Sequence, residues 1–164
     1  MKKITALVLA ALLLFALAAC GEPGDTGLKA GQQAPDFTLS QPGGGRVTLS
    51  ALRGRPVVLN FYTTWCPPCQ AEMPDFQAIF VEYGSSIHML GVSSGEAAAT
   101  VDAFLAEKGY TYPMAYDPDK AVSAVYNISF IPQTWVLDAD GVIVEYFGGM
   151  VTAERLRQAL DKAF

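Results

Sequence analysis

The stretch that decides the fold covers residues 57–69 and reads Val57-Val58-Leu59-Asn60-Phe61-Tyr62-Thr63-Thr64-Trp65-Cys66-Pro67-Pro68-Cys69. Its first six residues are β-branched, aliphatic or aromatic except for one asparagine, which is typical of a buried strand. Hydrophobic residues recur at spacings of three and four from Phe76 to Tyr83, and Gly84 then provides a stop signal. The stretch therefore predicts a strand followed by an amphipathic helix, with both cysteines at the junction.

The alternation of strand and helix continues toward the C-terminus. Ile87 to Val92 predicts a second buried strand, and Ser93 and Glu96 have the spacing of a capping box. We therefore expect these two residues to cap the helix that follows. Asp117-Pro118 predicts a short helix, because proline suits the first helical position, and Thr152 begins the last predicted helix.

Two hairpins are also predicted. Thr134 to Leu137 and Val142 to Phe147 flank Asp138-Ala139-Asp140-Gly141, and Asp-Gly is a strong hairpin signal. Near the N-terminus, Asp36 to Leu39 and Arg46 to Leu49 flank three consecutive glycines and predict an added hairpin. The whole pattern predicts an α/β domain with a mixed central sheet and helices on both faces.

Length, charge and composition exclude several classes of protein. A chain of 164 residues has room for one ordinary domain and a short appendage. Eleven basic against sixteen acidic residues give a formal charge of -5, and no basic run exists beyond Lys2-Lys3, so a nucleic-acid partner is not expected. Three cysteines and one histidine cannot complete a closed zinc site without carboxylates. We expect neither a metal nor a cofactor.

Residues 1–19 have the features of a secretory signal, because Lys2 and Lys3 precede an apolar stretch of sixteen residues. The segment Leu17 to Gly21 resembles the lipobox at which bacterial lipoprotein precursors are cleaved, which implies lipidation of Cys20. Alternatives are an ordinary signal peptide and an uncleaved anchor, although a spanning helix needs a minimum of about 17 apolar residues. In each case the domain is exported.

The mature chain divides into two parts. Residues 20–34 contain Gly, Pro, Asp and Gln with little apolar periodicity and predict a flexible tether. Residues 35–164 form the predicted domain, which we expect to be monomeric. Loss of residues 1–19 removes two lysines and no acid, so 9 basic and 16 acidic residues leave a mature charge of -7.

The two cysteines predict dithiol chemistry. At the start of a helix we expect the first, Cys66, to be exposed and the second, Cys69, to be turned inward. The positive end of the helix dipole stabilises a thiolate at Cys66, which attacks a substrate disulfide, and Cys69 then resolves the mixed disulfide. Pro67 and Pro68 have no backbone N–H, so the amide of Cys69 is the nearest donor to that thiolate. Modest thiolate stabilisation favours a reductant.

The cysteine pair has two other interpretations. A structural disulfide is disfavoured, because so small a loop removes little chain entropy. A metal site needs further ligands, and the only histidine, His88, lies within a predicted buried strand. A carrier that holds Cu(I) with soft thiolate ligands stays open as a non-catalytic alternative.

Residues 32–164 resemble the thioredoxin superfamily, and within it the membrane-tethered TlpA/ResA-type thiol-disulfide oxidoreductases of bacteria. The segments that carry the resemblance are Ala34-Pro35-Asp36-Phe37-Thr38-Leu39, Val57 to Cys69 with Glu72-Met73-Pro74, Tyr116-Asp117-Pro118, and Ile131-Pro132-Gln133-Thr134. The resemblance implies a thioredoxin-like fold in which the Ile131-Pro132 bond is cis and borders the cysteines. It also implies that the backbone of Ile131 pairs with the substrate, and that Trp65, Pro67 and Pro68 contribute to substrate contact.

Two residues near the cysteines bear on proton transfer. Glu72 follows Cys69 by three positions, and it matches a family glutamate proposed to manage protons at the site. A carboxylate shielded from water has a raised pKa and is suited to accept the Cys69 proton, whereas an exposed helix glutamate has no such role. Asn60 stands where thioredoxin has a buried aspartate, and an amide does not exchange protons as a carboxyl does.

The resemblance implies an extracytoplasmic enzyme that reduces protein disulfides, such as those of apocytochrome c, with electrons from a transmembrane dithiol donor. The same thiols also run oxidation or isomerisation under a different redox poise. Thiol peroxidase activity is a further alternative, because Thr63 precedes Cys66 by three residues as a peroxidatic threonine does. Leu59, however, replaces the proline expected four residues earlier.

Overall fold

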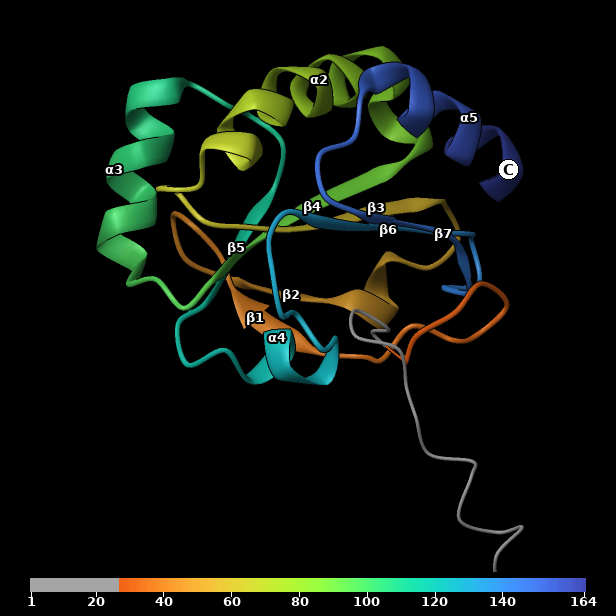
Figure 1. Cartoon of the computed structure of the whole chain (residues 1–164), viewed down its shortest axis with the longest axis horizontal. Helices are drawn as coiled ribbons and strands as arrows, with labels where there is room; N and C mark the ends of the chain where they lie inside the picture. Colours follow the sequence, from red (N-terminus) through yellow and green to blue (C-terminus); the bar gives the residue numbers. More distant parts are fainter. Residues whose placement is uncertain (1–26) are drawn as a thin grey trace, which may run out of the picture.

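The computed structural model describes residues 27–164, which form one seven-stranded sheet covered by helices on both faces (Figure 1). The elements in chain order are β1 (Thr38–Ser40), β2 (Arg46–Thr48), η2 (Leu49–Leu52), β3 (Val57–Tyr62), α2 (Pro67–Tyr83), η3 (Gly84–Ser86), β4 (His88–Ser94), α3 (Ala98–Lys108), β5 (Met114–Asp117), α4 (Ala121–Val125), β6 (Gln133–Leu137), β7 (Ile143–Gly148) and α5 (Ala153–Ala163). The predicted mixed-sheet α/β architecture is confirmed.

The sheet has the strand order β2-β1-β5-β4-β3-β6-β7. Strands β3, β4 and β5 are parallel, whereas β6 and β7 join the other side of β3 as an antiparallel pair. The predicted N-terminal hairpin is present, since β1 pairs antiparallel with β2 and extends the sheet beyond β5. Its turn contains Gly43, Gly44 and Gly45, whose φ angles of 75°, 91° and 92° suit glycine.

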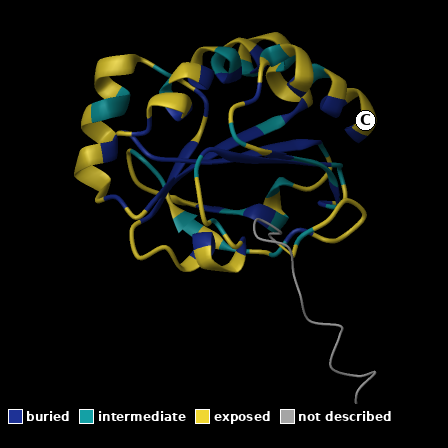
Figure 2. Cartoon of the chain, viewed as in Figure 1, coloured by how far each residue is buried: buried dark blue, intermediate teal, exposed yellow. Residues whose placement is uncertain are grey.

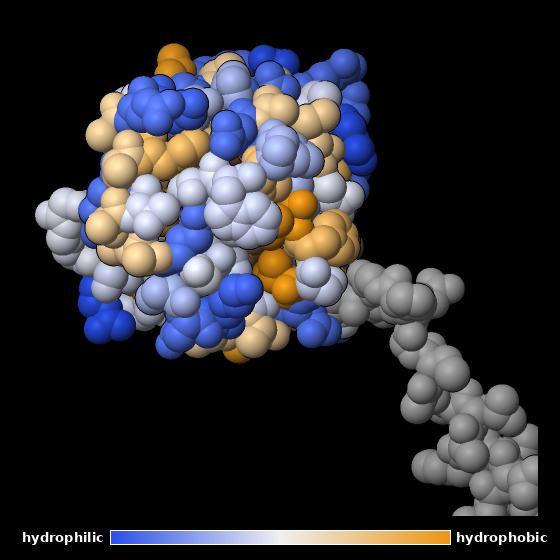
Figure 3. Space-filling view, turned by 60° about the vertical axis from the view of Figure 1, so that its left-hand side comes forward, coloured by the Kyte–Doolittle hydropathy of each residue, from blue (hydrophilic) through white to orange (hydrophobic). Residues whose placement is uncertain are grey.

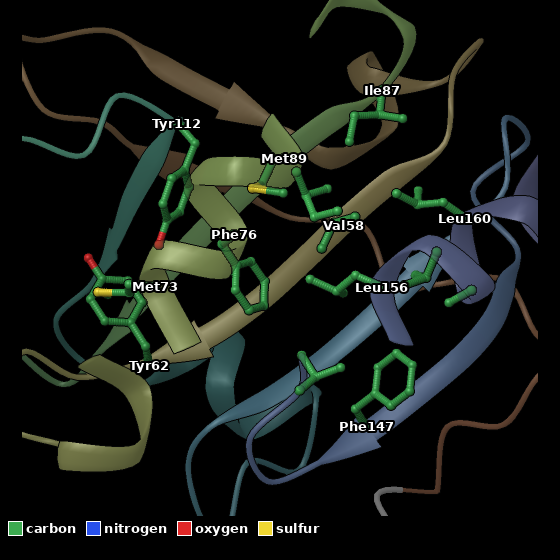
Figure 4. Close-up of a cluster of buried hydrophobic side chains, with 14 of the residues drawn as sticks. Val58, Tyr62, Met73, Phe76, Ile87, Met89, Tyr112, Phe147, Leu156 and Leu160 are labelled. Atoms are coloured by element: carbon green, nitrogen blue, oxygen red, sulfur yellow. The ribbon is translucent and has the colours of Figure 1, made fainter. Parts of the chain in front are cut away.

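Strand β3 is buried on both faces, which explains why its sequence is almost continuously apolar. Val58 and Tyr62 pack in the core layer beneath α2 and α5, while Leu59 and Phe61 pack in the layer on the opposite face, with α4. Figure 2 shows the buried sheet between exposed helices, and Figure 4 shows the layer that contains Phe76 of α2 and Leu156 of α5. The two core layers hold β3, and hence the start of α2, in a fixed position.

The β6–β7 hairpin has the predicted turn. Oδ1 of Asp138 accepts hydrogen bonds from the amides of Asp140 and Val142, both at 2.9 Å. The chain before β1 also contacts this hairpin: the amide of Gly31 donates to the carbonyl of Ile143 at 2.8 Å. Backbone hydrogen bonds to the domain therefore begin before residue 35, the predicted start of the domain.

The predicted signal, Cys20 and the rest of the predicted tether up to residue 26 lie outside the described residues. Among residues 27–164, no helix is both long enough and apolar enough to cross a membrane.

Candidate active site

Cys66 and Cys69 are joined by a disulfide at the start of α2, with their Cα atoms 5.3 Å apart. Cys66 is the N-cap residue of the helix, with extended backbone angles, and Pro67 and Pro68 occupy the first helical positions. The amide of Cys69 donates a hydrogen bond to Sγ of Cys66 at 3.2 Å. Because the two prolines have no N–H, this is the donor that the sequence predicted. The arrangement is the oxidised form of a dithiol pair.

The prediction that Cys66 is exposed is wrong for this disulfide form. Only 3% of Cys66 and 0% of Cys69 is accessible to solvent. The bond to the fully buried Cys69 draws the sulfur of Cys66 toward the helix, and the surface at this point is formed by Trp65, Pro67 and Pro68, which are exposed. The accessible surface over the oxidised pair is therefore formed by these neighbours rather than by sulfur.

The Ile131-Pro132 peptide bond is cis, as the resemblance implied. Antiparallel pairing of Phe61 with Gln133 places Pro132 at the end of β6 that adjoins the last residues of β3, on the side where the cysteines follow. The carbonyl of Pro132 accepts a hydrogen bond from the amide of Gly149 at 2.9 Å. The segment before β6 is thus fixed beside the start of α2.

Glu72 is buried, with 2% of its surface exposed, rather than being a solvated helix glutamate. Its Oε1 accepts a hydrogen bond from Nδ2 of Asn60 at 2.9 Å, and its Oε2 accepts one from the amide of Val151 at 3.0 Å. Burial raises the pKa of Glu72 to about 7, although both hydrogen bonds act in the opposite direction. Glu72 lies one helical turn after Cys69, so the two side chains share a face of α2.

The Nδ2 group of Asn60 also donates to Oγ1 of Thr134 at 3.0 Å. One side-chain amide therefore links β3 to α2 and to β6. Asn60 lies on the same face of β3 as Val58 and Tyr62, because alternate residues of a strand point the same way. This position explains why a polar residue interrupts the apolar run, because Asn60 provides a hydrogen-bond donor to the buried carboxyl of Glu72.

A second buried carboxylate, Glu96, was missed as a site residue. Its Oε2 accepts a hydrogen bond from the amide of Thr64 at 2.8 Å, and its Oε1 accepts one from Oγ1 of Thr64 at 2.5 Å. The predicted capping box is wrong: Ser93 donates to Glu96 at 2.8 Å, but α3 has Ala97 as its N-cap. The spacing of Ser93 and Glu96 did signal a local hydrogen bond, which here supports the loop before Cys66 instead of a helix.

Trp65 and Ile131 come together beside the disulfide. They line a groove of about 210 Å³ with Ile128, Phe130 and Lys120, and we call it the Trp65 groove. The large hydrophobic side chains with high exposure in the described chain are Trp65, Val81, Val125, Phe130, Met150 and Phe164. Two of the six therefore belong to this groove. Figure 3 shows one face of the molecule, on which a small hydrophobic area is bordered by hydrophilic side chains.

His88 begins β4 and is partly exposed. Its pKa is lowered mainly by burial and to a smaller extent by the charge of Arg55. Within residues 27–164, no group of three or more His, Cys, Asp or Glu side chains is arranged to hold a metal ion. Thr63, the residue that suggested a peroxidase, has a buried hydroxyl for which the described residues provide no hydrogen-bond partner.

Comparison with known proteins agrees with this geometry. A model of the AhpC/TSA family matches residues 30–146. The thioredoxin-like protein YneN of Bacillus subtilis is 36% identical over 140 residues, which cover 84% of this chain and 82% of the relative. The thiol-disulfide oxidoreductase ResA of Oceanobacillus iheyensis is 34% identical over 94% of this chain and 83% of the relative.

A solved structure has the same fold. It is described as a putative thiol:disulfide interchange protein DsbE from Chlorobium tepidum, and it superposes with a TM-score of 0.77 at 27% sequence identity. The superposition covers 83% of this chain and 98% of that one. The thioredoxin-like fold is therefore shared with proteins named for thiol-disulfide exchange, and the Cys66–Cys69 pair fits that activity.

Proposed function

Because this chain belongs to the AhpC/TSA family of thioredoxin-like proteins, we propose that it is an exported enzyme that reduces protein disulfides. It is a thiol-disulfide oxidoreductase, and Cys66 and Cys69 form the reactive pair. The observation that carries the proposal is the Cys66–Cys69 disulfide on the first turn of α2, with the Cys69 amide on Sγ of Cys66.

Reduction proceeds in two exchanges. The thiolate of Cys66 attacks one sulfur of a substrate disulfide, forms a mixed disulfide and releases the other substrate sulfur as a thiolate. The thiolate of Cys69 then attacks Sγ of Cys66, releases the second substrate thiolate and forms the disulfide observed here. Two electrons pass to the substrate in each cycle. A dithiol donor returns them by the reverse sequence.

Glu72 is proposed to take the proton of Cys69 during the second exchange. A pKa near 7 suits this task, because the carboxyl both accepts and releases a proton close to neutral pH. Its place one turn after Cys69 on α2 puts the two groups on the same helix face.

The direction of exchange follows from the donors around Cys66. One backbone amide stabilises its sulfur, since the two prolines supply none. A strong oxidant requires a specially stabilised reduced form, so weak stabilisation favours a reductant. Equilibration with dithiothreitol redox buffers should give a potential closer to that of thioredoxin, about -270 mV, than to that of DsbA, about -120 mV. A value near -120 mV would contradict reduction as the physiological direction.

The reactive pair is tested by trapping. Cys69→Ser should hold a mixed disulfide between Cys66 and an exported protein, visible as a band that disappears on reduction. Cys66→Ser is the matched control and should trap nothing. Mass spectrometry of the band identifies the client, with apocytochrome c among the proposed substrates and a transmembrane dithiol protein as the proposed donor. No trapped species, together with hydrogen peroxide consumption by the wild type, would favour peroxidase activity instead.

We also propose a lipid anchor at Cys20, with cleavage after residue 19 and a tether that holds the domain outside the cytoplasmic membrane. The support is the sequence alone, through the charged start, the apolar stretch and Leu17 to Gly21. Cys20→Ser should abolish incorporation of labelled fatty acid and should release the protein from washed membranes or leave its precursor uncleaved. Unchanged labelling would contradict the anchor. Cys66→Ser serves as the control for loss of a thiol.

A further inference from the structure

The Trp65 groove has one cationic side chain at its edge. Its walls are otherwise apolar or hydroxyl-bearing, with Trp65 69% and Phe130 44% exposed, and Lys120 supplies the charge. A volume of about 210 Å³ is smaller than the roughly 300–1,000 Å³ of small-molecule sites. The groove therefore suits one or two side chains of an extended peptide better than a cofactor.

Lys120 is held in this position by an uncommon backbone conformation. Its φ and ψ angles are 60° and 23°, in the left-handed region that glycine and asparagine favour over lysine. The amide of Lys120 donates to the carbonyl of Asp117 at 3.1 Å, and the amide of Gly95 donates to the same carbonyl at 2.8 Å. The carboxylate of Asp117 is fully buried and accepts hydrogen bonds from the amide and hydroxyl of Ser123. The turn that presents Lys120 is thus well supported.

The stem of Lys120 lies directly on Gly95. A methyl group built on Gly95 would stand 3.2 Å from Cγ and 3.3 Å from Cδ of Lys120 and closer still to Cε, so a larger residue there would displace the lysine. Gly95 also has a φ of +75°. An unfavourable conformation at Lys120 and a glycine beneath its stem together direct a long cationic side chain toward the groove. Backbone strain of this kind is commonly retained at functional sites.

The ammonium group of Lys120 has no ion pair within residues 27–164. Asp119, the acidic residue before it in the chain, accepts a hydrogen bond from the amide of Ala121, and Glu96, next to Gly95, is bonded to Thr64 and Ser93. This cation lines the same groove as Trp65, the residue that precedes Cys66 in the chain. It is therefore available to a negatively charged group of a docked partner.

We propose that Lys120 is a specificity residue that selects substrates with a carboxylate side chain close to the reactive disulfide. The occupant of the groove is an extended segment of the substrate protein, with an apolar side chain between Trp65 and Phe130 and an acidic side chain at Lys120. The proposal rests on the proposed function, because it places this segment next to the disulfide that Cys66 attacks. Recognition of an extended segment beside a sheet is a recurrent mode of peptide binding.

The test uses three disulfide-bonded peptides that differ only near one cysteine, where they carry Glu, Gln or Lys. The full-length wild type should reduce the Glu peptide about 2- to 5-fold faster in kcat/KM than the Gln peptide at low salt, the range of a solvent-exposed ion pair. The preference should shrink as ionic strength rises. Lys120→Gln should abolish it, and Lys120→Glu should favour the Lys peptide.

Two further variants keep the result interpretable. Lys120→Gly removes the ammonium but suits the left-handed backbone, so the variant should fold and should lose the preference. Lys162→Gln makes the same charge change on α5, where Lys162 pairs with Glu145, and it should retain the preference. Equal rates for Glu and Gln peptides in the wild type, or an unchanged Glu preference in Lys120→Gln, would overturn the proposal. Failure to reduce any peptide would instead overturn the proposed function.

Discussion

The buried carboxyl of Glu72 should make the stability of the oxidised protein depend on pH. Its pKa is raised by burial from 4.5 to about 7 in the folded chain, so between these values the folded state holds a proton that the unfolded state has lost. Stability therefore falls as pH rises through this window and levels off above about 7. The gap between the two pKa values corresponds to about 3 kcal/mol.

Glu72→Gln replaces the titrating group with a neutral one of the same shape. Its carbonyl oxygen still accepts from the Val151 amide, and the side-chain amide of Asn60 must turn to accept from the new NH₂ group. The unfolding free energy of the variant minus that of the wild type should therefore increase by about 3 kcal/mol as pH rises from 4.5 to 8.5. Urea unfolding of both oxidised proteins at these pH values measures the gain directly.

Glu82→Gln on the same helix is the matched control. Glu82 is exposed, and its hydrogen bonds with Arg157 lower its pKa, so its replacement removes a stabilising interaction near neutral pH and brings no gain. If the curves for the wild type and Glu72→Gln ran parallel from pH 4.5 to pH 8.5, burial would not perturb the Glu72 carboxyl. The proposed proton transfer from Cys69 would then lose its physical basis.

Three further substitutions test the packing around the site in urea titrations. Phe76→Ala removes a fully buried ring and should cost about 3–5 kcal/mol, whereas Val81→Ala on the exposed side of the same helix should cost less than about 0.5 kcal/mol; similar losses for both would refute the core assignment. Gly91→Ala places a methyl group against a core methionine and two tyrosine rings and should cost about 1–3 kcal/mol, so a neutral effect would contradict this close approach. Asn60→Asp puts a second carboxyl beside Glu72, and its cost should grow as pH rises above neutrality; a cost independent of pH would argue against like-charge repulsion.

Local sequence patterns were sufficient to predict much of this fold. The apolar run in β3 requires burial on both faces, and Asp138 to Gly141 contains a turn whose hydrogen bonds are made within a few residues. The place of the cysteines at the start of α2 follows from the same local rules. These features depend on neighbours in the chain, so a single sequence is enough to infer them.

Other parts of the site depend on contacts between distant residues. The bond between Glu72 and the Val151 amide joins positions 79 apart, and Thr64 meets Glu96 from 32 residues away. No periodicity or spacing encodes such pairs. The burial of Cys66 was likewise mispredicted, because its exposure depends on the bond to Cys69 and on the packing of the helix start rather than on its position in the motif.

The loop between β7 and α5 connects two parts of the site through the backbone. The Gly149 amide holds the carbonyl of Pro132, and the Val151 amide holds the carboxylate of Glu72, with one exposed methionine between them. A proton that arrives at Glu72 weakens its charge-assisted bond to Val151, two residues from the bond that fixes the cis-proline segment. The titrating carboxyl and the cis-proline segment therefore share one three-residue anchor, which joins them through the backbone alone.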